Sequence, residues 1–407
     1  MSVLNHGAAA LLGFGLFAGL APAQDWTEAA VVQQFLEQSP HAREARARTA
    51  IAEADARGRT LYANPRLRYV REGAGLTEFL QAEQQLHLSG RLRFLRDAGA
   101  SSVLAAQADG AFELWQARSD LRLAFFQVLA GQERELRYAA ALREIEGVIA
   151  ILATREREGE GSTFDRLRAE RERAELRAEL ELLRATIELD RARLLAFLPP
   201  ATSIPRVAGR LDPTLPPSLE PASLAGRAFT LRADFRAEQQ RLNLFRFEQR
   251  AAERLRIPEP TVSAGYKRAD IGQGLIAHGG VVEFTVPLPL FNKGQAEVSR
   301  FTAEQQRTQA RLDLLAQQIH AEISGALRAL QVRASARDRY RHELAASGEQ
   351  LVRIATIAYQ EGDIGILQLL DAYRTQRESQ LRLIDIQLAV KQAQIELERV
   401  LGEEFPQ

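Results

Sequence analysis

The sequence contains no cysteine, one methionine and six histidines among its 407 residues. The absence of cysteine excludes disulfides, thiolate metal sites, cysteine nucleophiles and a lipid-anchored N-terminal cysteine. The scarcity of methionine and histidine limits the coordination of soft metal ions. The 53 basic and 53 acidic residues give a net charge of zero, which argues against nucleic-acid binding driven by overall charge.

Long hydrophobic runs are absent after the N-terminal region. No later stretch approaches the roughly 20 apolar residues that a membrane helix needs. If the chain enters a membrane, it must therefore do so with β-strands. Apart from α-helices, only β-strands in a closed barrel satisfy all backbone hydrogen bonds in lipid.

Motifs of catalysis are missing as well. There is no nucleophile elbow, phosphate-binding loop, zinc-binding helix motif or paired-carboxylate signature. We therefore expect no enzyme activity, no cofactor and no nucleic-acid partner. Five histidines lie on separate segments without i, i+4 pairing, which predicts no metal site. They are His41, His87, His278, His320 and His342.

The N-terminal residues predict export from the cell. Ala8 to Leu20 is a short apolar run without charge, and Ala21-Pro22-Ala23 follows as a cleavage pattern. We interpret residues 1–23 as a secretory signal peptide. The alternative of a membrane anchor is weaker, because about 13 residues cannot span a bilayer core.

The mature chain shows one series of segments twice. Each series has a helix, two short strands, a very long helix, a glycine turn and a last helix. In the first series these segments are 26–58, 65–71, 78–88, 92–158, 159–162 and 163–197. In the second they are 222–256, 261–267, 280–288, 294–359, 362–365 and 366–401.

This order predicts an internal duplication. The first repeat comprises residues 24–198 and the second residues 222–407, with a proline-rich linker at 199–221. The turn from Gly159 to Ala169 aligns without a gap on the turn from Gly362 to Ala372. Self-similarity at one period is the signature of repeated architecture.

The predicted strands alternate apolar and polar residues. Val282 and Phe284 share one face, and Glu283 and Thr285 share the other. In an outer-membrane barrel the apolar face meets lipid and the polar face meets a wet lumen. Four strands cannot close a barrel, since about eight is the smallest useful number. We therefore expect oligomerisation, in which two copies give eight strands or three copies give twelve.

Helices of roughly 65 residues would extend about 100 Å at 1.5 Å per residue. Heptad-like seams, such as Leu383, Ile386 and Val390, favour contacts with neighbouring helices. The helices are thus expected to continue the barrel as a tube on one side of the membrane.

At this point the chain resembles the TolC family of outer-membrane efflux factors. The resemblance is carried by the doubled order of segments and by three strings, Asn64–Leu67, Glu83–Arg91 and Val286–Gln295. The last string is similar to the form in the CzcC-like cation-efflux branch.

The resemblance implies a mixed α/β membrane protein: a homotrimer with a twelve-stranded barrel in outer-membrane lipid and a long periplasmic α-helical barrel. It also implies two partners, a periplasmic adaptor (membrane fusion protein) and an inner-membrane RND-type pump.

Site residues follow from matching positions in the family. The periplasmic aperture is expected at Asp371, at Gln368, which replaces a family carboxylate, and at Asp165 of the first copy. Because of Gln368 we expect weaker cation capture there. From the residues alone, Asp371 could equally be a solvated carboxylate at a helix start.

The turns that would dock the adaptor contain Gly159, Ser162, Gly362 and Gly365, although glycines at such positions are primarily turn formers. Four further residues are expected at the transition from barrel to tunnel, where the prolines end a strand. They are Pro287, Pro289, Gly294 and Gly90.

The leading hypothesis is a passive exit duct in the outer membrane, with a periplasmic domain, for divalent heavy-metal cations. A drug-export or type I secretion duct has the same architecture. A periplasmic coiled-coil adaptor is the alternative from another class, but an adaptor needs one helical hairpin and this chain has two.

Overall fold

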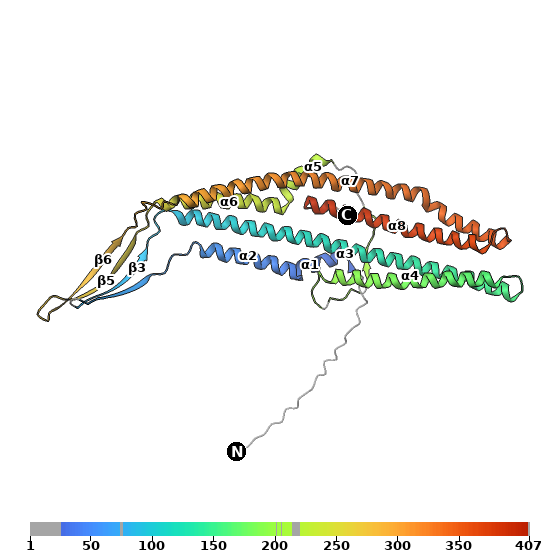
Figure 1. Cartoon of the computed structure of the whole chain (residues 1–407), viewed down its shortest axis with the longest axis horizontal. Helices are drawn as coiled ribbons and strands as arrows, with labels where there is room; N and C mark the ends of the chain where they lie inside the picture. The colour runs from blue at the N-terminus through green and yellow to red at the C-terminus, as the bar shows by residue number, and fades with distance from the viewer. Residues whose placement is uncertain (1–25, 74–75, 201, 205, 214–219, 406–407) are drawn as a thin grey trace, which may run out of the picture.

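A computed structural model describes residues 26–73, 76–200, 202–204, 206–213 and 220–405, without the side chains of 344–347. The predicted signal peptide, residues 1–23, lies outside the described residues. Figure 1 shows an elongated molecule, with a sheet at one end and two helical hairpin turns at the other.

Four long helices form the body of the molecule. They are α3 (Arg91–Arg157), α4 (Thr163–Leu195), α7 (Gln295–Glu361) and α8 (Ile366–Leu401). The helix predictions for these segments are confirmed to within two residues at each end. At 67 residues each, α3 and α7 extend about 100 Å. Within the described part of the chain, no helix is long and apolar enough to cross a membrane.

Four strands form one antiparallel sheet in the order β2-β3-β5-β6. They are β2 (Arg66–Glu72), β3 (Thr77–Gln85), β5 (Thr261–Asp270) and β6 (Ile276–Thr285). The central pairing of β3 with β5 joins the two halves of the chain. β6 begins four residues before the predicted position and ends before Pro287 and Pro289, because proline has no backbone N–H for the strand ladder.

The helices predicted as single segments at 26–58 and 222–256 are each broken, so this prediction is wrong. They are replaced by α1 (Glu28–Gln38), α2 (Pro40–Gly58), α5 (Pro221–Leu231), α6 (Ala233–Glu253) and a 3₁₀ turn, η1 (Arg254–Arg256). The break after α1 lies at Ser39, whose hydroxyl accepts a hydrogen bond from the Ala42 backbone N–H at 3.0 Å. Pro40 fits the first helical position, where its missing N–H costs nothing.

The second break lies at Arg232, which has an extended backbone. Its guanidinium binds Asp234 at 2.7 Å and Glu322 at 2.6 Å. The two short strands β1 (Trp26–Thr27) and β4 (Val207–Ala208) pair in parallel, so the segment after α4 returns to the start of α1.

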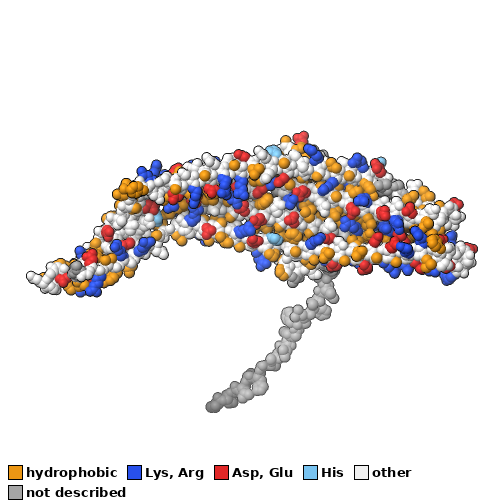
Figure 2. All heavy atoms as spheres, in the orientation of Figure 1, with side chains coloured by type: hydrophobic (Ala, Val, Ile, Leu, Met, Phe, Trp, Pro, Cys, Tyr) orange, Lys and Arg blue, Asp and Glu red, His pale blue; other side chains and the backbone are white. Residues whose placement is uncertain are grey.

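Apolar side chains are buried in three clusters along the body rather than in one central core. One of these clusters includes Phe35 on α1, Phe125 on α3 and Ile395 on α8. Figure 2 shows acidic and basic side chains interspersed over the visible face of the helices. An elongated bundle of this kind buries each helix along a stripe and leaves the rest exposed.

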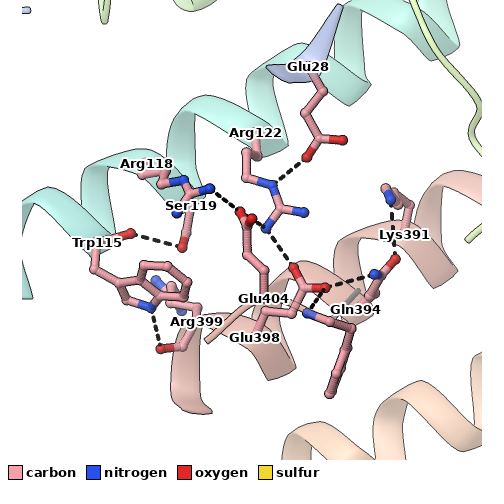
Figure 3. Close-up of polar contacts among 11 residues, drawn as sticks. Glu28, Trp115, Arg118, Ser119, Arg122, Lys391, Gln394, Glu398, Arg399 and Glu404 are labelled. Carbon is pink, nitrogen blue, oxygen red and sulfur yellow. Dashed lines mark hydrogen bonds and ion pairs between the residues drawn. The ribbon is translucent and has the colours of Figure 1, made fainter. Parts of the chain in front are cut away.

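A buried ionic network joins α1, α3 and α8 near the middle of the molecule (Figure 3). Arg122 on α3 contacts Glu398 on α8 at 2.6 Å and Glu28 on α1 at 2.5 Å. The side chains of Arg122 and Glu398 are 3% and 1% exposed. Glu398 also accepts hydrogen bonds from the Gln394 side chain at 2.7 Å and from the Phe405 backbone at 3.3 Å.

Lys391 lies beside this network, where its ammonium donates to Gln394 at 3.2 Å and sits 4.6 Å from the Phe126 ring centre. Burial lowers the pKa of Lys391. Charged groups in such a site are stable only when each has its partners.

We expect Arg122→Met to lower the free energy of unfolding by about 3–5 kcal/mol, because Glu398 would keep its charge in a buried site without the guanidinium. Urea unfolding followed by circular dichroism in detergent measures the change. Arg134→Met is the matched control, since Arg134 on α3 also pairs with α8, through Asp385 at 2.8 Å, but in a more exposed site. The control should cost at most about 1 kcal/mol, and equal losses in the two variants would contradict the expectation.

Candidate functional site

The two hairpin turns at the far end of the body are each built on a glycine with a left-handed backbone. Gly159 has φ 77° and Gly362 has φ 84°, a region that other residues rarely adopt. The Ser162 hydroxyl then accepts the Phe164 backbone N–H at 3.1 Å and caps α4. Gly365 is the residue before α8. These four residues therefore shape the turns, as their residue types predict.

The two hairpins pack against each other directly behind these turns. A cluster of buried apolar residues from all four long helices includes Leu152, Ala169, Ala355 and Leu369. Arg155 on α3 donates to the backbone oxygen of Gln360 at 3.3 Å and lies over the Tyr359 ring. The tip is thus one packed unit.

An ion pair also joins the hairpins. Glu172 on α4 contacts Arg374 at 2.7 Å and Arg377 at 3.6 Å, both on α8. The Glu172 side chain is only 11% exposed, which makes the contact stronger than a surface pair. The hydrogen bond that Arg374 donates to the Glu172 carboxylate raises the pKa of Arg374. We call the contacts of Glu172 with Arg374 and Arg377 together the tip ion pair.

Two of the three predicted aperture residues lie together. Gln368 and Asp371 line a hollow of about 390 Å³ beside the tip ion pair. Its other charged lining residues are Arg168, Glu172 and Arg374. Two carboxylates face two guanidinium groups, so the hollow in a single chain carries no excess negative charge.

Asp165 is not among the residues that line this hollow. It lies near Tyr359 instead, whose pKa is raised by burial and then by the Asp165 carboxylate. Asp165 aligns with Gln368 in the two turns, but within one chain the two residues do not line the same hollow.

Sequence reasoning missed Glu172 and its arginine partners. Glu172 lies in a helix with many glutamates and arginines at i, i+4 spacing, so nothing in its local sequence distinguishes it. Its partner Arg374 is 202 positions away. A comparison of the charges in the two aligned hairpins is the only signal that could have paired them.

The predicted transition residues lie where the sheet meets the helices. Gly90 (φ 72°) and Gly294 (φ 83°) occupy the same position, directly before α3 and α7. A Cβ on Gly294 would lie 2.6 Å from the Ala252 backbone oxygen, so this residue needs glycine for space as well as for φ. Pro287 and Pro289 lie in the segment between β6 and α7.

The sheet has one apolar face that stays exposed. Its register places Leu80 opposite Tyr69 and Tyr266, and Ala264 opposite Ala82 and Val282. The larger of these side chains are 45–70% exposed, as is Phe284. The opposite face carries Gln81 and Ser263, which are 5% exposed. The apolar face therefore points outward and has no partner within the described chain.

No metal site is formed by the residues that the structure describes: no group of three or more histidine, aspartate or glutamate side chains could hold an ion.

Known proteins share sequence features with this chain. Residues 224–403 match the family model for outer membrane efflux proteins. The chain is 28% identical over 335 residues to the cobalt-zinc-cadmium resistance protein CzcC of Cupriavidus metallidurans, covering 80% of this chain and 77% of that protein.

Solved structures share the fold. A membrane protein from Pseudomonas aeruginosa matches with a TM-score of 0.74 at 20% identity over 92% of both chains. The outer membrane protein VceC of Vibrio cholerae matches with a TM-score of 0.71 at 20% identity, over 93% of this chain and 97% of that one.

Long helical hairpins that carry an antiparallel sheet at one end are thus the architecture that this chain shares with solved outer-membrane channels such as OprN. Within this chain, residues 224–403 match the outer membrane efflux protein family. This match and the similarity to CzcC identify an efflux channel of the outer membrane with a helical periplasmic part, which is a transport duct rather than an enzyme. The resemblance inferred from the sequence is confirmed.

We expect Glu172→Gln to increase the resting conductance of this channel in planar bilayers, because the substitution weakens the contact between the hairpins. If the substitution lowers the free energy that favours the closed tip by about 1 kcal/mol, the ratio of open to closed channels rises about fivefold. Glu175→Gln is the control, since Glu175 pairs at 3.1 Å with Arg171 on its own helix. Identical conductance in Glu172→Gln and the wild type would show that the tip ion pair does not restrain opening.

Proposed function

We propose that three copies of this chain form an exit duct, with a twelve-stranded barrel in the outer membrane and a helical tunnel in the periplasm. The observation that carries the proposal is the sheet, whose apolar face is exposed and whose edge strands β2 and β6 lack an outer partner among the described residues. Open sheet edges are not tolerated in lipid. Pairing β6 of one copy with β2 of the next removes both edges.

Exposed apolar side chains on the long helices support the assembly. Leu182 and Leu189 on α4, one heptad apart, are 72% and 63% exposed, and Ile354 and Ile357 on α7 are 58% and 49% exposed. Each would be covered by a helix of a neighbouring copy. A tunnel needs every helix to contact two neighbours, and these surfaces supply the second contact.

The two halves, 24–198 and 222–407 with the linker 199–221, are proposed to be copies of one helix–β-hairpin–helix unit. Their corresponding helices support this division: α1 and α5 have 11 residues each, and α3 and α7 have 67 each. Two strands and two long helices per unit then give a three-chain assembly six nearly equivalent sectors.

The hairpin turns are proposed to dock a periplasmic adaptor, to which an RND-type inner-membrane pump delivers the cargo. Gly159, Ser162, Gly362 and Gly365 form these turns at the end of the body farthest from the sheet (Figure 1). Phe164, in the first turn of α4, is 63% exposed, which suits a helical partner that binds end to end. An adaptor role for this chain itself is disfavoured by its sheet.

Divalent heavy-metal cations are proposed as the cargo. Support comes from the similarity to CzcC, named for resistance to cobalt, zinc and cadmium, which extends over 80% of the chain. Selection would be made by the pump, since the described residues offer no metal-binding group.

The assembly is tested with the full-length protein extracted from outer membranes. We expect a trimer by size-exclusion chromatography with light scattering, and ion conductance after insertion into planar bilayers. A water-soluble monomer without conductance would rule out the duct. A conducting dimer would keep the duct but reject the twelve-stranded barrel.

The cargo is tested by deleting the gene in its host. Tolerance to zinc, cobalt or cadmium should fall and should return with the wild-type gene. Unchanged metal tolerance together with raised sensitivity to antibiotics would assign the duct to drug export, and loss of a secreted protein would assign it to secretion.

The aperture is proposed to be lined by Asp371 and Gln368, with Asp165 outside the narrowest part. Three copies of Asp371 would attract divalent cations, so Asp371→Ala should weaken the block of conductance by externally added Mg²⁺ or Co²⁺. The control is Asp165→Ala, which should leave the block unchanged. Equal block in Asp371→Ala and the wild type would remove Asp371 from the aperture.

A further inference from the structure

A second hollow, of about 320 Å³, lies at the junction between the sheet and the helices. The chain reaches it from both halves, through the end of β3, the start of α3, η1 and the segment after β6. Polar lining comes from Ser89, Arg91, Arg254 and Asn292, and apolar lining includes Leu255 and Leu288. The hollow is separate from the tip, and transport through the duct does not account for it.

Arg91 has a donor in this region that the chain leaves unused. Its Nε is buried and has no hydrogen-bond partner among the described residues. Buried donors are almost always satisfied, so an orphaned one calls for an acceptor from outside the chain. The Arg91 backbone is fixed by a hydrogen bond from its N–H to the Ser89 hydroxyl at 3.2 Å.

Arg254 supplies a second guanidinium to the same hollow. Its Cζ lies 5.4 Å from the Phe94 ring centre, a contact that restricts the side chain. Within the described residues, neither Arg91 nor Arg254 forms an ion pair with a carboxylate. Both charges are therefore available to a ligand.

The carboxylate of Glu259 also lines the hollow, but it is already engaged. Its Oε1 accepts from the Ser89 hydroxyl at 2.5 Å, and its Oε2 lies 2.8 Å from His87 Nδ1. Two guanidinium groups thus face one satisfied carboxylate, and the hollow favours an anion.

Apolar side chains continue from the hollow along the segment that connects β6 to α7. Leu288, Leu290 and Phe291 are 72%, 67% and 91% exposed. Figure 2 shows hydrophobic side chains beside Lys and Arg side chains at this junction. An anion site bordered by exposed apolar groups fits an amphiphile better than a free ion.

We propose that this hollow binds the phosphate of a phospholipid from the periplasmic leaflet of the outer membrane, with Leu288, Leu290 and Phe291 against its acyl chains. Guanidinium groups bind phosphate through paired N–H donors. The site lies at the end of the exposed apolar sheet face, where lipid headgroups would meet the protein. The proposal rests on the proposed insertion of the sheet into the membrane. A free phosphate would share the polar contacts but would leave the apolar segment uncovered.

The test uses the full-length protein in neutral detergent with dioleoyl phosphatidylglycerol, and counts bound lipid by native mass spectrometry. The double variant Arg91→Gln/Arg254→Gln should bind the lipid at least about tenfold more weakly than wild type. Arg93→Gln/Arg96→Gln is the matched control. It removes the same charge from exposed positions on α3 that do not line the hollow, so it should retain the lipid.

A third variant, Phe291→Ser, tests the apolar part at a position that is 91% exposed, so the substitution removes no buried side chain. It should also weaken lipid binding. Equal retention in the two arginine double variants overturns the proposal, and so does displacement of the lipid by inorganic phosphate at matched concentration. Conductance is recorded in a separate experiment. If the wild type and all variants fail to conduct, the proposed duct is refuted. Lipid binding is measured in detergent and does not depend on conductance, so loss of lipid in Arg91→Gln/Arg254→Gln and Phe291→Ser alone still supports the lipid site.

Discussion

The antiparallel pairing of β3 with β5 is the contact on which the rest of the molecule depends. Each half of the chain supplies one hairpin, and a two-stranded hairpin alone is marginally stable. Nine residue pairs along β3 and β5 turn two hairpins into one sheet. Because α3 follows β3 and α6 precedes β5, the same pairing sets the helices of the two halves side by side. The Arg122–Glu398 network then joins the halves in the middle of the body, and the tip ion pair joins them at its end.

These three connections differ in what they can do. The strand pairing is continuous backbone bonding and fixes the sheet. The Arg122–Glu398 contact is buried, so breaking it leaves an uncompensated charge. The contact of Glu172 with Arg374 and Arg377 lies closest to the turns and is partly open to water. The contacts that join the two halves are thus more exposed to water at the tip than in the middle. The hairpins can therefore move apart at the tip while the middle of the bundle keeps its packing.

The sequence predicts the regular elements well because their periodicities are strong. The strands alternate with a period of two, and the long helices have no internal proline. The breaks in the first helix of each half were missed for different reasons. Pro40 after Ser39 is a recognisable helix start, and it could have been read as one. Arg232 is not a residue type that marks a helix start, and its guanidinium is held by Asp234 two residues away and by Glu322, a contact across 90 positions.

The same limit applies to the candidate site. Asp371 and Gln368 could be placed at the tip from their position after a turn and from the resemblance. The role of Glu172 arises from side chains more than 200 positions away, which no local pattern records. The unused donor of Arg91 is likewise visible only once the ends of β3, η1 and β6 are seen to converge.

The Arg122–Glu398 network has a consequence for the order of events during biosynthesis. Glu398 is made 276 residues after Arg122, and Phe405, which also binds Glu398, is later still. The contact can therefore form only after residue 398 has been synthesised, and contacts so distant in sequence form slowly. A chain that stops before Glu398 would therefore carry Arg122 in the bundle without the carboxylate that is its most buried partner.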